Sequence, residues 1–117
     1  MGSIIVHINF FIGLSYVLVL ILAGLFEIAF VISLRYSDGL TKLKPTVAFI
    51  FFGALSFTCL AKTLGKIPMG TAYAVWTGIG AAGTVILGIL VFNEPVSILR
   101  LFFVTTLIVS IIGLKFS

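Results

Sequence analysis

Charged residues are scarce in this sequence. Only 9% of its 117 residues are Asp, Glu, Lys or Arg, whereas 62% are hydrophobic, and soluble globular domains carry about 25% charged residues. Because one transmembrane helix needs about 20 apolar residues, the chain has room for four spans and little room for a soluble catalytic domain. The composition therefore predicts an all-α membrane protein that acts within the bilayer.

Residue types that bind metals or perform catalysis are equally sparse. The single cysteine, Cys59, excludes an intrachain disulfide and a multi-cysteine metal site. His7 is the only histidine and has no Cys, Asp or Glu beside it, so we expect no metal and no cofactor. The basic residues are scattered rather than gathered in a patch, which argues against nucleic acid as a partner. No nucleophile lies in a pattern with a base and an orienting group, so an enzyme is not expected.

The sequence does contain four long apolar runs, and residues rich in Gly, Pro, Asn or Asp separate them. The runs predict helices at about residues 16–34, 45–63, 71–92 and 96–114. Residues 16–117 are thus expected to form a single four-helix transmembrane domain. Residues 1–15 are predicted to be an N-terminal extension, which could continue the first helix, lie at the membrane interface or reflect the choice of start site.

Basic residues are divided almost evenly between the two ends of the predicted bundle. Lys62, Lys66 and Lys115 would lie on one side of the membrane, and Arg35, Lys42, Lys44 and Arg100 on the other. Since an excess of Lys and Arg marks the cytoplasmic side, this distribution gives no meaningful bias. The chain could therefore insert both ways and pair as an antiparallel homodimer, or it could have one weakly determined topology.

Glu27 is the exceptional residue, because it lies inside an apolar run. An ionised side chain at the bilayer centre costs on the order of 2.5 kcal/mol or more, so an acid there indicates a functional site. No Lys, Arg or His lies near the middle of another predicted span to form a structural ion pair. Gly24 and Phe30 share a helix face with Glu27, and the small residue would leave space for a ligand beside the carboxylate.

Other predicted helices offer side chains that could surround a cation at Glu27. Tyr73 and Trp76 lie at helical spacing and provide both an aromatic face and a hydrogen-bond donor. Ser56 supplies a hydroxyl near the middle of the second helix. Each residue also has a structural interpretation, since Tyr is common at membrane interfaces, aromatic residues pack together, and Ser can bond to its own helix.

A single intramembrane acid favours one kind of chemistry. Two copies of Glu27 in a dimer would resist ionising together, so protons and cations would compete for the pair. A carboxyl group that releases a proton to admit a cation, and loses the cation when it is reprotonated from the other side, performs proton-coupled antiport. Two inverted subunits that exchange conformations would switch the site between the membrane faces, as in inverted-repeat transporters.

Four segments carry a resemblance to a known family: Phe26-Glu27 and residues 36–45, 67–80 and 111–115. Over about residues 16–117 the chain resembles the small multidrug resistance family, and the third-helix segment is the most specific match. Gly24 and residues 77–81 and 93–95 resemble the guanidinium-exporter subtype more than the quaternary-ammonium subtype.

The resemblance implies an antiparallel, dual-topology homodimer in a bacterial-type inner membrane that exchanges guanidinium or substituted guanidiniums for protons. It implies that Glu27 of both subunits forms the shared site and that Ser56, Tyr73 and Trp76 form a hydrogen-bond network around it. Phe30 departs from the family pattern, because a Trp is typical there. Phenylalanine cannot donate a hydrogen bond, so we expect a site that is more tolerant of hydrophobic substituted cations.

Two other functions and one other assembly stay open. The chain could export a broader range of quaternary-ammonium and aromatic cations, or it could be a non-transporting membrane subunit that modulates a partner. The dimer could also be a heterodimer, since some small exporters work as unlike pairs.

Overall fold

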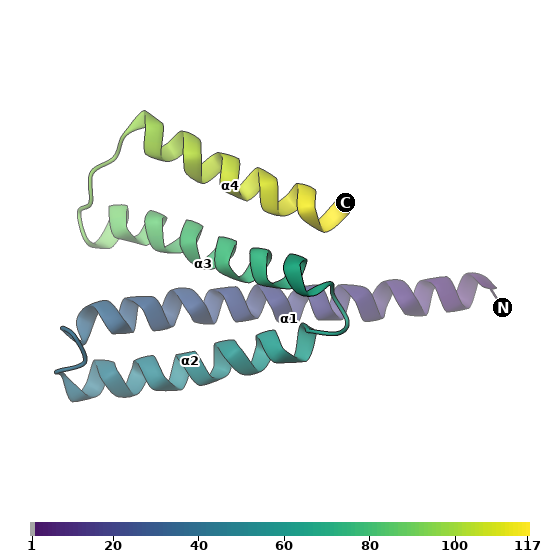
Figure 1. Ribbon diagram of the computed structural model, residues 1–117, viewed down its shortest axis with the longest axis horizontal. Coiled ribbons are helices and arrows are strands. Elements are labelled where there is room, and N and C mark those ends of the chain that lie inside the picture. The colour runs from purple at the N-terminus through teal and green to yellow at the C-terminus, as the bar shows by residue number, and fades with distance from the viewer. Residues whose placement is uncertain (1) are drawn as a thin grey trace.

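The computed structural model describes residues 2–117, except for the side chains of residue 3 and residues 5–12, which include the His7 side chain. The described chain folds into four α-helices, α1 (Gly2–Tyr36), α2 (Leu43–Thr63), α3 (Met69–Val91) and α4 (Ile98–Phe116) (Figure 1). Each helix contains a stretch that is long and apolar enough to cross a membrane. The expectation of an all-α chain with four possible spans is therefore confirmed.

The helices run alternately up and down, and α1 lies at the centre of the packing (Figure 1). α1 packs against both α2 and α3, whereas α4 packs against α3 alone within the described residues. The α1–α2 and α3–α4 connections therefore lie at one end of the bundle, and the α2–α3 connection lies at the other. α1 and α3 run in the same direction, so their C-terminal halves lie beside each other.

Turn chemistry fixes the three connections where the sequence predicts them. Gly39 and Gly65 have positive φ angles of 70° and 88°, a backbone conformation that glycine adopts without strain. Pro45 lies in the first turn of α2, where its missing N–H costs no helical hydrogen bond. Ser97 caps α4, because its hydroxyl oxygen accepts a hydrogen bond from the backbone N–H of Arg100 at 3.0 Å.

The first helix is longer than the sequence pattern predicts. Its structure begins at Gly2 rather than near residue 16, so residues 2–15 continue α1 instead of forming a separate interfacial segment. The apolar run contains no proline to end the helix. At about 1.5 Å per residue, α1 is about 52 Å long, well beyond the roughly 30 Å hydrocarbon core of a bilayer. Its N-terminal part projects past the other helices in Figure 1.

The buried core is small and lies where α1, α2 and α3 meet. It consists of Leu20, Ala23, Leu60, Ala72, Val75 and Trp76. No residue of α4 is buried, and its apolar side chains are free to face lipid or another protein. In a bilayer, apolar side chains that face lipid carry no solvation penalty, so exposure on this helix is compatible with a stable fold.

Candidate functional site

Glu27 projects from α1 toward α3, and its carboxyl group lies against the backbone of Gly80. A methyl group at position 80 would overlap that carboxyl group, so only glycine leaves room for the acid here. The Oε2 atom of Glu27 is buried and has no hydrogen-bond partner among the described residues. An unpaired carboxyl oxygen away from water is costly, and this position therefore requires a proton, a cation or a partner from outside the chain.

Ser56 connects three helices close to Glu27. Its hydroxyl donates to the backbone carbonyl of Ala23 on α1 at 2.7 Å and accepts from the indole N–H of Trp76 on α3 at 2.9 Å. Ser56 and Ala23 are fully buried and Trp76 is only 6% exposed. Because Ala23 precedes Glu27 by one helical turn, this network fixes α2 and α3 against the part of α1 that carries the acid.

This geometry decides between the two interpretations of the Ser56 hydroxyl. It bonds across helices and not within its own helix, unlike Thr58, whose hydroxyl donates to the carbonyl of Ala54 at 2.7 Å. Neither Ser56 nor Trp76 bonds to Glu27 in the described chain, since each is paired elsewhere. Both side chains thus join the helices that carry Glu27 and Gly80 and do not bond to the acid itself.

A continuous row of aromatic rings runs beside this network. Phe49 contacts Phe30 with ring centroids 5.8 Å apart, and Phe30 stacks on Phe57 at 6.1 Å. Phe57 in turn contacts Trp76 at 5.2 Å, and Trp76 contacts Tyr73 at 5.8 Å. We call these five residues the aromatic row; it includes three of the predicted site residues.

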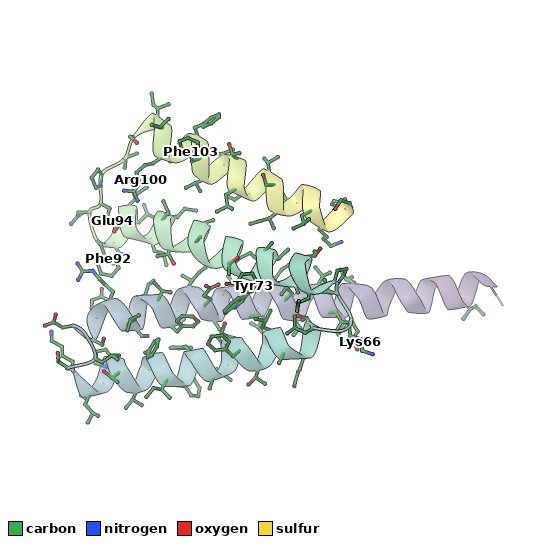
Figure 2. The ribbon with its side chains drawn as sticks, in the orientation of Figure 1. Lys66, Tyr73, Phe92, Glu94, Arg100 and Phe103 are labelled. Carbon is green, nitrogen blue, oxygen red and sulfur yellow. The ribbon has the colours of Figure 1, made fainter. Side chains whose placement is uncertain are left out.

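Tyr73 ends the aromatic row and is its most accessible predicted site residue, with 58% of its surface exposed. It lies in the N-terminal half of α3 (Figure 2). Its ring is available to a ligand or to a second subunit, whereas the indole of Trp76 is buried behind it. Phe57 within the row is also 56% exposed, so the row can offer aromatic faces to a cation at both Tyr73 and Phe57.

Gly24 contributes to helix packing rather than to an open space. A Cβ atom there would lie 2.7 Å from Cγ2 of Ile79 on α3, and Gly83 makes the reciprocal close contact with Ile28 of α1. Small residues thus let α1 and α3 approach closely. The space that we expected beside Glu27 at Gly24 is filled by Ile79.

One polar residue at the α1–α3 contact escaped the sequence analysis. The hydroxyl oxygen of Thr84 on α3 is buried and has no hydrogen-bond partner among the described residues. Thr84 follows Gly80 by four residues, and this spacing could have indicated that it shares the helix face of α3 that contacts Glu27. However, a threonine inside an apolar helix usually bonds to its own backbone. The sequence gives no signal that this bond is missing.

Comparisons with known proteins show which proteins this chain resembles. Residues 14–108 match the family model described as Small Multidrug Resistance protein. Proteins named "Guanidinium exporter" from Proteus vulgaris and Yersinia pestis are 44% identical over 98 residues, which cover 84% of this chain and 94% of theirs. A protein of the same name from Salmonella typhimurium is 44% identical over 100 residues, which cover 86% of this chain and 95% of that protein.

Proposed function

The chain belongs to the small multidrug resistance family, and we propose that it exports guanidinium in exchange for protons. The name of the similar proteins, guanidinium exporter, supports the substrate, because the similarity covers most of both chains. The observation that carries the proposal is Glu27, a carboxyl group in an apolar span with a buried oxygen that no described group satisfies. A proton or a guanidinium ion would satisfy it.

Competition for one carboxyl group is sufficient for coupled exchange. The ionised carboxylate of Glu27 binds a guanidinium ion, and protonation of the same group removes the charge that holds the cation. By linkage, each ligand lowers the affinity for the other by the same factor. Export then requires only that Glu27 face the two sides of the membrane in turn, as in the alternating access of other transporters.

We further propose that the functional unit is an antiparallel homodimer in the bacterial inner membrane, with Glu27 of both subunits forming one site. The near-equal division of basic residues between the two ends of the bundle supports dual topology. The open carboxyl group and the absence of buried residues on α4 support a second subunit. A heterodimer with an unlike chain is the alternative assembly.

The aromatic row and the buried network have separate roles in this proposal. Tyr73 offers an exposed aromatic face that can stack on a planar cation. Ser56 and Trp76 hold the helices in register around Glu27, since each is already hydrogen-bonded to the other. The site therefore needs no cofactor in this proposal, because the exchange uses only the carboxyl group and its surroundings.

A broader cation exporter is the second candidate, and Phe30 is the observation that favours it. Phe30 stacks on Phe57, meets Phe49 edge to face and provides no hydrogen-bond donor. An apolar wall there would accept alkyl or aromatic substituents on the cation more readily than a polar one. A non-transporting subunit that modulates a partner is the third candidate.

Proton flux in liposomes that contain only this protein tests the proposal. We expect an imposed pH gradient to drive guanidinium uptake and an imposed guanidinium gradient to move protons in the opposite direction. Preference for quaternary ammonium over guanidinium would favour the broader exporter. Absence of flux with every cation would contradict transport by this chain alone, and co-reconstitution with a second family member would then test the heterodimer.

A further inference from the structure

Two buried side-chain oxygens lack a hydrogen-bond partner among the described residues, and both lie at the contact between α1 and α3. They are Oε2 of Glu27 and Oγ1 of Thr84. Several other threonines of the bundle bond to the carbonyl four residues earlier, as Thr58 does to Ala54 at 2.7 Å and Thr77 to Tyr73 at 2.8 Å. The hydroxyl of Thr84 is therefore free both to donate and to accept.

The spacing on α3 places Thr84 midway between two carboxyl groups. Gly80, Thr84 and Gly88 follow one another at intervals of four residues and share a helix face, with about 6 Å between successive Cβ positions. The Glu27 carboxyl lies against Gly80, and the Glu94 carboxyl lies against Gly88. One water molecule with two hydrogen bonds of about 2.8 Å each would bridge a gap of about 6 Å.

A small cleft lies along the part of this row that runs from Thr84 to Glu94. It has a volume of about 100 Å³ and is lined by Thr84, Gly88, Phe92 and Glu94 together with Arg35 and two aliphatic residues of α1. The Glu94 carboxylate and the Arg35 guanidinium give water polar partners, and the cleft has room for more than one molecule, while the Thr84 hydroxyl oxygen lies buried next to it. Glu94 and Phe92 lie at the end of the bundle opposite Lys66 (Figure 2).

We propose that Thr84 and Glu94 form a water-assisted proton relay between Glu27 and the membrane face at which α1 and α3 end. This inference rests on the proposed exchange of guanidinium for protons at Glu27. The proton leaves the Glu27 carboxyl for a water molecule, which passes one of its own protons to the Thr84 oxygen. The original hydroxyl proton moves to a water in the cleft and then to the Glu94 carboxylate, which releases it to bulk water. Each relay oxygen gains and loses one proton, so Glu27 alone ends with a changed charge.

The relay is interrupted on both sides of the Thr84 hydroxyl in this conformation, because that oxygen is buried and unpaired among the described residues. Thr84 lines the cleft, but Glu27 does not, and the side chain of Ile28 packs tightly on Gly83 beside the missing step. A shift of α1 against α3 is needed to admit the first water. This gate keeps the relay compatible with coupled exchange, because a permanently connected relay would let protons cross without the cation.

The outer end of the cleft is unfavourable for the entry of guanidinium. Arg100 lies 3.5 Å from the Glu94 carboxylate, and the guanidinium of Arg35 lies 5.2 Å from the Phe92 ring centroid, on which Tyr36 also packs. Two fixed positive charges against one negative charge repel a substrate cation. The same charges oppose a proton, but proton transfer along hydrogen bonds needs no continuous opening wide enough for an ion, so the relay is distinct from the path of the substrate.

The variant Thr84→Val tests the relay, because valine keeps the shape and removes only an unpaired hydroxyl. Such a replacement is not expected to destabilise the fold. We expect guanidinium uptake driven by a pH gradient to slow about tenfold, the factor that corresponds to one lost hydrogen bond. Exchange of labelled for unlabelled guanidinium at equal pH moves no net protons, and we expect it to stay within about twofold of the wild type.

Two controls accompany this measurement. Thr84→Ser keeps the hydroxyl and should retain pH-driven uptake, whereas Thr58→Val removes a hydroxyl that is already satisfied in its own helix and should behave as the wild type. Full pH-driven uptake in Thr84→Val would overturn the relay alone. Equal losses of pH-driven uptake and of guanidinium exchange in that variant would overturn it too, in favour of a role in packing. A wild type that exchanges guanidinium but does not respond to a pH gradient would instead overturn the proposed proton coupling and the relay with it.

Discussion

The indole N–H of Trp76 donates to the hydroxyl of Ser56 at 2.9 Å, and both side chains are buried where three helices meet. Because the same hydroxyl donates to the carbonyl of Ala23, one serine satisfies a donor on α3 and an acceptor on α1. Hydrogen bonds between transmembrane helices average about 0.6 kcal/mol in double-mutant cycles. Because two such bonds share the Ser56 hydroxyl, we expect that replacing Ser56 shifts the helices and with them the position of Glu27.

Ser56→Ala should therefore destabilise the fold by about 1 kcal/mol, because it leaves the Trp76 N–H unpaired and removes the bond to the Ala23 carbonyl. Reversible unfolding in mixed micelles would measure the change. Trp76→Phe removes the other partner of the same bond, so the double variant should lose less than the sum of the two single losses. Strictly additive losses would mean that the two side chains do not interact in the folded protein.

Gly80→Ala should abolish transport, because the new methyl group would occupy the position of the Glu27 carboxyl. The acid would have to leave its contact with α3, and we expect a loss of guanidinium uptake of at least about a hundredfold, the effect of displacing a functional group by about 1 Å. Gly53→Ala is the matched control, since its added methyl group would have no neighbour within 4 Å. Normal uptake by Gly80→Ala would show that Glu27 works from a different position.

Glu27→Gln should leave the protein folded and dimeric while ending proton-coupled exchange, because glutamine has a similar shape but takes up no proton. In the wild type, guanidinium affinity should fall as pH falls, since protonation removes the charge that binds the cation. The apparent dissociation constant should rise by up to about tenfold per pH unit for each competing proton. Calorimetric titrations at several pH values would measure this slope, and a pH-dependent affinity retained in Glu27→Gln would contradict the assignment.

The sequence pattern was sufficient for the number of helices and for three of their four starting points to within about two residues, and it singles out Glu27 as an acid inside a span, because both depend on local composition. Turn residues locate all three connections, and an acid in an apolar run stands out without any neighbour. The hydrogen-bond partners of Ser56 could not be predicted, since a serine that bonds to its own helix and a serine that bonds to another helix look the same in the sequence. For the same reason, the sequence could not predict that the Thr84 hydroxyl lacks a hydrogen-bond partner among the described residues. We expected Gly24 to leave space for a ligand, because the sequence of α1 does not reveal that Ile79 of α3 fills this space.

Phe30→Trp should narrow the range of exported cations. Phe30 lies between Phe49 and Phe57 in the aromatic row, and its replacement adds both volume and an indole N–H at the edge of the proposed site. The donor could steady the Glu27 carboxylate for unsubstituted guanidinium, while the extra volume would exclude alkyl groups. One methylene group in an apolar pocket is worth about 1–3 kcal/mol of discrimination, so we expect uptake of an alkylated guanidinium to fall at least about tenfold relative to guanidinium.

Uptake of both compounds in competition, with Phe102→Trp on the exposed surface of α4 as control, measures that ratio. If the wild type already rejects every substituted cation, Phe30 does not broaden the site, and its contacts with Phe49 and Phe57 serve packing alone.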